Sequence, residues 1–418
     1  MEAIRKRVRR WTASPAADAW HVDSADGFRV ICVLLVMWFH IWQQSWLSPT
    51  LKLGGVTLSL EPQVRTGYMA VDLMLMLSGF LLFLPYARRR LLGAPQESTA
   101  RYYIKRALRI VPCYYLCVFV VLFGFALPRG EYGGNMRHLW IDLLSHLTFT
   151  HNLFYESYLG THLNGSLWTL AVEVQFYLIL PLLGRAFEKK PALTWTLMTA
   201  AALAYRGWYL PTRDNFSLYF NRLPAMLDVY ANGMAASLMY VSLCKRLKND
   251  RFSGLFFTAV ALLCGYLIFE ILRVQNQTAG QIGIQPGQVY WRWRLNACGA
   301  LFLVAGGHAS RWLRFLLSNR VMRFLSAISF NVYMWHQYLA LRLKDWHIPP
   351  YQAESMPQRA GEQPWMTQYT WICFGAALLL ATLLTYAVEK PVYRLGERVL
   401  LKGSAHGANE RRKNHAHQ

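Results

Sequence analysis

An arginine and a histidine lie eleven positions apart in the first long apolar stretch of the chain, residues 28–40. In a helix, Arg29 and His40 fall on nearly the same face, about 16 Å apart along the axis. That face would carry a cation near one membrane surface and a titratable imidazole inside the bilayer. Such groups cost about 2.5–3.5 kcal/mol on insertion scales, so they usually face a protein interior or a wet cavity. Alternatively, Arg29 snorkels to the surface and His40 is a hydrogen-bonded structural residue.

Further titratable side chains are predicted at a similar depth. Glu173 lies about 12 Å below the outer end of its predicted span, and His40 lies about 18 Å above the inner end of its own. These depths coincide in a hydrocarbon core about 30 Å thick. His336 reaches the same level, and Asp72 and Asp228 fall slightly nearer the outside. Each could be structural, but together they predict the lining of one polar chamber for reaction or transport.

Arginines are predicted at the cytoplasmic mouth of this chamber. Arg106 and Arg109 share one face at the entrance of the third span, and Arg29 lies at a similar depth. The planar guanidinium suits phosphate and pyrophosphate oxygens. Basic residues beside a membrane often contact only lipid head groups, which is the alternative. The position of Arg109 inside the apolar run favours a ligand beyond lipid.

The composition indicates an all-α, polytopic integral membrane protein. The 418 residues are 54% hydrophobic and 16% charged, with a mean hydropathy of +0.18. A soluble protein of this size would need more charge to cover its surface. We expect about ten transmembrane helices, at residues 28–47, 66–87, 107–127, 165–184, 192–210, 222–243, 253–272, 292–308, 321–342 and 368–388. Residues 138–154 are predicted to be amphipathic or re-entrant, and outer connections are expected at 128–164, 211–221, 273–291 and 343–367.

The net charge is +22, and the distribution of the basic residues along the chain predicts the orientation. Basic residues gather in alternate connections, near residues 5–10, 88–106, 185–190, 245–248, 311–323 and 390–413. This positive-inside pattern predicts that both termini lie in the cytoplasm. The charge therefore reflects topology and anionic lipid, and no nucleic-acid partner is expected. We predict a basic cytoplasmic arm (1–27), a membrane domain (28–395) and a polar cytoplasmic tail (396–418), with no metal site and no disulfide framework.

Six motifs resemble those of the acyltransferase-3 family of membrane O-acyltransferases. They occur in family order between about residues 26 and 395, which makes the resemblance specific. They are Arg29-x10-His40, VDL with LSGFL (71–73, 77–81), RALRIVP (106–112), LWTLAVEVQFY (167–177), ISFNVYMWH (328–336) and EKP (389–391). Three positions depart from the family pattern: Val174 replaces a second glutamate, and Met74 and Leu75 replace two aromatic residues.

The resemblance implies a multi-pass O-acyltransferase of the cell membrane, of the bacterial inner-membrane type. Such an enzyme moves an acyl group, typically acetyl, from cytoplasmic acyl-CoA to a hydroxyl of a cell-surface carbohydrate or glycolipid. It implies that Arg29 and His40 form the essential first-helix motif, and that Arg106 and Arg109 handle acyl-CoA. Glu173 matches the family's acidic residue. No bound cofactor is expected, because acetyl-CoA is a co-substrate.

Acyl transfer from a thioester needs a base for the acceptor hydroxyl, and His40 is the best-placed candidate. We expect Glu173 to orient the second ring nitrogen of His40. His336, Asp72 and Trp168 are predicted to bind the acceptor, although His336 could equally be structural. Direct transfer and an acyl-enzyme relay both remain open, and the oligomeric state is not predicted. The competing interpretation is a transporter or flippase of a glycan or lipid intermediate, but repeated halves and broken helices are lacking.

Overall fold

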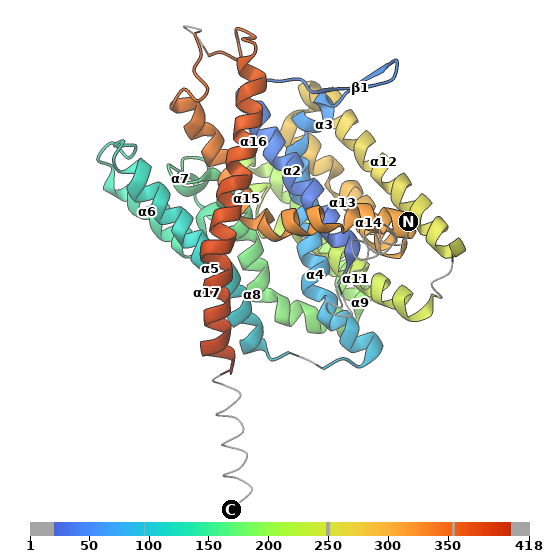
Figure 1. Cartoon of the computed structure of the whole chain (residues 1–418). Coiled ribbons are helices and arrows are strands. Elements are labelled where there is room, and N and C mark those ends of the chain that lie inside the picture. The colour runs from blue at the N-terminus through green and yellow to red at the C-terminus, as the bar shows by residue number, and fades with distance from the viewer. Residues whose placement is uncertain (1–20, 96, 248–250, 353–355, 403–418) are drawn as a thin grey trace, which may run out of the picture.

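The computed structural model describes residues 21–95, 97–247, 251–352 and 356–402. Every predicted span coincides with a helix (Figure 1). These helices are α2 (Asp23–Ser45), α4 (Ala70–Leu92), α5 (Thr99–Val121), α8 (Trp168–Lys189), α9 (Pro191–Ala204), α11 (Leu227–Arg246), α12 (Arg251–Ile282), α13 (Ile284–His308), α15 (Arg320–Asp345) and α16 (Trp365–Leu384).

Shorter elements connect and extend these helices. Short helices are α3 (Glu61–Arg65), η1 (Gly67–Met69), α6 (Met136–Leu147), η3 (His151–Leu153), α7 (Tyr155–Tyr158), η4 (Gly165–Leu167), η6 (Leu210–Thr212), α10 (Phe216–Tyr219), η7 (Leu223–Met226), α14 (Arg311–Leu317) and α17 (Lys390–Gly396). π-Helical turns are η2 (Leu122–Ala126), η5 (Tyr205–Tyr209), η8 (Thr385–Glu389) and η9 (Glu397–Lys402).

Six helical segments of the described chain are long and apolar enough to cross a membrane. They are α2, α12, Gly67–Leu92, Thr99–Ala126, Gly165–Lys189 and Trp365–Leu400. The remaining long helices, α9, α11, α13 and α15, do not meet that test of length and composition. α13 carries buried polar residues such as Arg292 and Asn296, which a helix can hold where it packs inside other helices. A helical membrane protein is therefore supported, while the count of about ten spans and the cytoplasmic termini stay predictions.

The predicted outer connection at 273–291 is wrong. α12 continues to Ile282 and α13 begins at Ile284, so Gly283 alone separates the two helices. Gly283 has a φ of 91°, which residues other than glycine rarely adopt. The buried side chain of Gln275 closes this corner by donating to the Ile284 carbonyl and to the Tyr68 hydroxyl. At 32 residues, α12 is about 48 Å long and exceeds the ~30 Å hydrocarbon core.

The helices extend beyond the predicted ends of the membrane domain, whose bounds stay a prediction. α2 begins at Asp23, inside the predicted arm, and helical structure continues to Lys402, inside the predicted tail. The predictions for residues 1–20 and 403–418 lie outside the described residues. An antiparallel hairpin, β1 (Thr50–Leu53) and β2 (Val56–Ser59), interrupts the expected all-α pattern. It lies at the end of the molecule opposite α17 (Figure 1).

The segment predicted to be amphipathic forms α6, on the flank opposite α12 (Figure 1). Its 12 residues span about 18 Å, too short for the ~30 Å core. Met136, Trp140 and Leu144 are exposed, whereas Asp142 and His146 are fully buried. The amphipathic character is confirmed, with the polar face turned into the protein.

α4 packs closely along α11. At the crossing, a Cβ on Gly233 would lie 2.1 Å from the Met76 carbonyl oxygen, and one on Gly79 would lie 2.7 Å from the Tyr230 carbonyl oxygen. Only glycine lets the two backbones approach this closely, a common device in membrane helix packing. This close contact sets the rotation of α4 about its axis, and so sets the direction in which Ser78, a residue of the candidate site, points.

Candidate active site

A cavity of about 310 Å³ lies between α2, α4, α5, α8 and α15. Its charged lining residues are Arg29 of α2, Arg106 and Arg109 of α5 and Glu173 of α8. The structure therefore brings together the three arginines that the sequence analysis placed at one depth. Apolar side chains of α4, such as Met74 and Leu81, complete the wall.

The three arginines of this cavity form no ion pair with a carboxylate among the described residues. Arg29 Nη1 donates to Ser326 Oγ at 3.2 Å. The Arg106 guanidinium lies over the rings of Tyr102 and Tyr177, and its Nε is buried without a partner. Glu173 is the single acidic lining residue in the described part of the chain, so the cavity has an excess of positive charge and suits a phosphate-bearing anion.

Glu173 is held firmly at the wall of this cavity. Its Oε1 accepts hydrogen bonds from Ser78 Oγ and from Tyr177 Oη, each at 2.6 Å. Tyr177 is one turn further along α8, so the helix itself places its hydroxyl beside the carboxylate. The expectation that Glu173 orients His40 is wrong, because this carboxylate accepts from Ser78 and Tyr177 while His40 Nδ1 lies beside Gln43 Oε1.

The depth of Glu173 was mispredicted because α8 begins deeper in the membrane domain than expected. Asn164 Nδ2 and Ser166 Oγ, just before α8, both donate to the Met334 carbonyl oxygen of α15. Met334 lies eleven residues before the end of α15 at Asp345, which is about 16 Å along the helix. α8 therefore starts deep beside the middle of α15, so Glu173 lies further inward than counting from a membrane surface predicted.

His40 and His336 form a separate pair of imidazoles, with ring centroids 5.1 Å apart. His40 Nδ1 lies 2.8 Å from Gln43 Oε1, and His336 Nδ1 lies 2.7 Å from the Tyr333 carbonyl oxygen. Since these oxygens can only accept, both protons belong on Nδ1, and each Nε2 keeps its lone pair. The geometry makes His40 Nε2 available as a base, with Gln43 in the orienting role expected of Glu173.

The cavity does not reach His40. Its lining ends at Thr169 and Tyr333, where Thr169 Oγ1 donates to the Tyr333 hydroxyl at 2.9 Å. The Tyr333 ring in turn lies 5.6 Å, centroid to centroid, from the ring of His336. The prediction of one chamber is therefore wrong: a hydrogen-bonded Thr169–Tyr333 pair lies between the arginine-lined cavity and the two histidines.

Asp72 and Asp228 lie in buried ion pairs, outside the lining of this cavity. Asp72 Oδ2 accepts from Arg292 Nε at 3.0 Å, and both side chains are fully buried. Asp228 pairs with Arg206 of the π turn after α9. Neither arginine was predicted from the sequence, although opposite charges inside predicted spans were the signal that could have found them.

Trp168, predicted to bind the acceptor, lies at the start of α8 and is not among the cavity residues. Its ring lies 6.3 Å from that of Tyr158, centroid to centroid. The structure therefore places it beside the connection that precedes α8.

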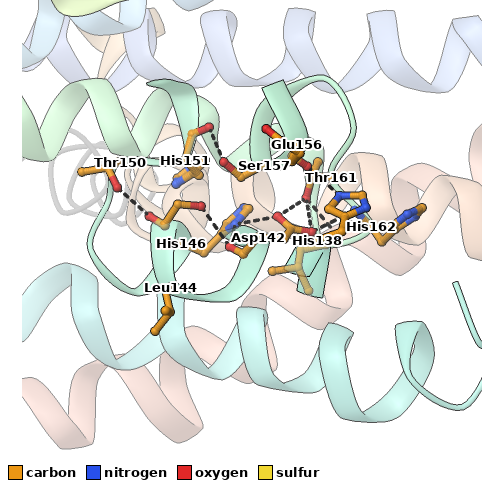
Figure 2. Close-up of polar contacts among 12 residues, drawn as sticks. His138, Asp142, Leu144, His146, Thr150, His151, Glu156, Ser157, Thr161 and His162 are labelled. Atoms are coloured by element: carbon orange, nitrogen blue, oxygen red, sulfur yellow. Dashed lines mark hydrogen bonds and ion pairs between the residues drawn. The ribbon is translucent and has the colours of Figure 1, made fainter. Parts of the chain in front are cut away.

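A polar cluster that the sequence analysis also missed centres on Asp142 of α6 (Figure 2). Its carboxylate accepts from Thr161 Oγ1, from the backbone N–H of His162 and from the Tyr132 hydroxyl, and it pairs with His146. Burial alone would raise the pKa of Asp142, but the bonds from His146, His162 and Thr161 outweigh it and lower that pKa. The cluster thus ties α6 to the connection before α8.

The stacked rings of His146 and His151, with centroids 4.0 Å apart, extend this cluster. Burial, and secondly the neighbouring His146, hold the pKa of His151 well below its ordinary value, so its ring is neutral. Gln175 of α8 donates to the Phe149 carbonyl and to Asn152 Oδ1, which fastens the same connection to α8. The cluster therefore supports the helix that presents Glu173.

Comparison with known proteins gives a family and distant relatives. The acyltransferase-3 model, described as an acyltransferase domain, matches residues 22–387. The chain is 23% identical over 338 residues to the peptidoglycan O-acetyltransferase OatA of Listeria monocytogenes, covering 76% of this chain and 49% of that protein. It is 26% identical over 212 residues to nodulation protein 10 of Rhizobium leguminosarum bv. viciae, covering 48% of this chain and 54% of that protein. The chain spans about half the length of these curated relatives, and no solved structure matches it significantly.

Proposed function

The chain belongs to the acyltransferase-3 family, whose acyltransferase domain matches residues 22–387, and on this premise we propose that it is a membrane O-acetyltransferase acting on a cell-surface carbohydrate or glycolipid. The donor in this proposal is acetyl-CoA, entering from the cytoplasm. The acceptor is a hydroxyl of peptidoglycan, of another surface polysaccharide or of a glycolipid. The printed name of the Listeria relative, a peptidoglycan O-acetyltransferase, supports a carbohydrate acceptor.

One observation carries the choice of donor: three arginines that lack a carboxylate partner among the described residues line one cavity. The phosphate groups of CoA are anions that arginine binds through paired N–H donors. Glu173, fixed by Ser78 and Tyr177, would accept hydrogen bonds from amide N–H groups of the pantetheine arm. The donor would thus lie with its phosphates at Arg29, Arg106 and Arg109 and its thioester toward Tyr333.

The reaction needs a base at the acceptor hydroxyl. In the proposal, Nε2 of His40 takes this proton while the hydroxyl oxygen attacks the thioester carbonyl. Collapse of the tetrahedral intermediate forms the ester, and the proton passes from the imidazole to the departing CoA thiolate. Nε2 of His336, buried without a partner, would accept from a second hydroxyl of the sugar. For the thioester to meet His40, the hydrogen bond between Thr169 and Tyr333 must open.

Replacing Arg109 with alanine is expected to raise the KM for acetyl-CoA about 10- to 100-fold, because one charge-assisted hydrogen bond is worth about 1.5–3 kcal/mol. The KM for the acceptor should stay unchanged. Steady-state kinetics with each substrate varied in turn would measure both constants. Arg101→Ala is the matched control, since Arg101 is on the same helix but pairs with Glu97 outside the cavity. An equal loss for donor and acceptor would contradict the assigned role of Arg109.

Replacing Gln43 with leucine is expected to lower kcat about tenfold, since loss of one orienting hydrogen bond is worth ~1 kcal/mol. The KM for acetyl-CoA should not change, and Gln43→Glu, which keeps an acceptor oxygen, should retain more of the activity. Gln44→Leu is the control, because Gln44 contacts Lys344 rather than His40. If Gln43→Leu and Gln44→Leu gave the same kcat, Gln43 would have no positioning role.

The acceptor can be found by comparing surface glycans of cells with and without the protein by mass spectrometry. The proposal expects the mass of one or more acetyl groups to disappear from a single glycan class in the deletion strain. Identical acetylation of every surface glycan in the two strains would argue against the proposed function.

A further inference from the structure

A second cavity, of about 220 Å³, lies where α11, α12, α13 and α14 meet. Its wall includes Tyr240 of α11, Phe257 of α12, His308 of α13 and Arg314 of α14, and it shares no lining residue with the first cavity. A water molecule occupies about 30 Å³ in the liquid, so this cavity has room for a considerably larger group. Nothing in the proposed reaction uses it.

The polar side of this second cavity is basic. The Nε of Arg314 is buried and has no hydrogen-bond partner, and Arg314 and His308 both line the cavity. Neither Arg314 nor His308 forms an ion pair with another described residue. His308 Nε2 lies 3.9 Å from Cys244 Sγ, but a neighbouring guanidinium would repel a metal ion at these two atoms. The site therefore favours an anion.

The other side of the second cavity is apolar, with Leu243, Leu247 and Phe257 in its wall. The space also depends on Gly307, where a Cβ would lie 2.5 Å from Cε2 of Tyr240 and would push that ring aside. A cationic wall next to an apolar wall fits a phosphate group that is attached to a glycerol backbone carrying acyl chains.

Its place in the fold points to the membrane surface. The second cavity lies among the last turns of α11 and α13 and the first turns of α12, at the end of the molecule where the charge pattern predicts the cytoplasm. Lys245 and Arg246 in the last turn of α11 add positive charge there. Basic pockets between membrane helices at this level bind the head groups of anionic lipids.

We propose that this second cavity binds the phosphodiester head group of an anionic phospholipid, with Arg314 as the principal ligand. The planar guanidinium of Arg314 donates to the phosphate oxygens, and the apolar wall contacts the glycerol backbone and the first part of the acyl chains. This site is independent of the acyl-transfer reaction, because it involves none of the residues assigned to that reaction.

The test uses the full-length protein, purified in detergent and freed of lipid, and native mass spectrometry to count retained lipids. Titration with phosphatidylglycerol should show one tight site that phosphatidylcholine does not fill. Arg314→Gln should weaken phosphatidylglycerol binding at least about tenfold, since a charge-assisted hydrogen bond is lost. Arg314→Lys keeps the charge and should retain most of the binding. This result would show that the loss in Arg314→Gln is not caused by misfolding. Arg311→Gln, an exposed arginine of the same helix, should have no effect.

Two results would overturn the lipid site. Equal weakening by Arg314→Gln and Arg311→Gln would mean that the surface attracts anionic lipid without a specific pocket. Equal retention of phosphatidylcholine and phosphatidylglycerol would mean that the head-group charge is not recognised. A third arm uses glycerol 3-phosphate: much weaker binding than that of phosphatidylglycerol supports the lipid, whereas equally tight binding assigns the pocket to a soluble phosphate and overturns the lipid assignment.

Discussion

Replacing His40 with alanine is expected to lower the rate of acetyl transfer about 10²- to 10⁴-fold, the usual contribution of a general base. The effect should fall on kcat, because His40 is not among the residues that line the donor cavity. Binding of acetyl-CoA, measured by equilibrium dialysis or calorimetry on the purified variant, should therefore be unchanged. This separation of binding from chemistry distinguishes the proposed base from a residue that merely maintains the fold.

The control for this variant is His347→Ala. His347 is exposed, and its ring stacks on Tyr351, away from the candidate site. It should retain full activity. A His40→Ala protein that transfers acetyl groups at the wild-type rate would remove the proposed mechanism. A His40→Ala protein that no longer binds acetyl-CoA would place His40 in donor binding instead.

Replacing Asp72 with leucine is expected to destabilise the protein by about 3–5 kcal/mol, because Arg292 would keep a buried charge without its partner. Both side chains have 0% exposure, so water cannot take over the missing contact. The double variant Asp72→Leu/Arg292→Met should recover most of this loss, since it removes both charges together. Thermal unfolding in detergent, followed through the reactivity of buried cysteines, would compare the three proteins.

This pair of variants also decides whether Asp72 binds the acceptor, as the sequence first indicated. If it does, the double variant will be stable but will show a raised KM for the acceptor. If Asp72 only neutralises Arg292, the double variant will be both stable and normal in acceptor binding. Asp345→Leu is a suitable control, because the partly exposed Asp345 carboxylate pairs with Arg342 near the surface, where an ion pair is worth about 0–1 kcal/mol. A single variant as stable as the wild type would contradict the expected cost.

The helical membrane class and the approximate place of each long helix could be predicted from the sequence, because both follow from local apolar runs. The grouping of the three arginines of the cavity could also be predicted from the sequence. Arg106 and Arg109 are three positions apart on one helix, so their common face is fixed by helix geometry alone. Arg29 joins them because the first helix carries it at a similar depth.

Features that depend on contacts between distant segments were not predictable in this way. The depth of Glu173 follows from Asn164 and Ser166 bonding to the middle of α15, which no local pattern reveals. Similarly, Asp72 and Arg292 are 220 positions apart in the chain. Gln43 was overlooked because a glutamine near a helix end carries no charge to attract attention, although it is the residue that contacts His40 Nδ1.

The most direct test of acyl transfer is to incubate the purified protein, reconstituted in lipid vesicles, with acetyl-CoA labelled in the acetyl group and with fragments of surface polysaccharide. We predict that label appears in an ester of the polysaccharide, that free CoA is released in equal amount, and that His40→Ala slows both at least about 100-fold. If the protein leaves acetyl-CoA intact and instead moves a glycan or lipid across the vesicle membrane, the proposed acyl transfer is contradicted.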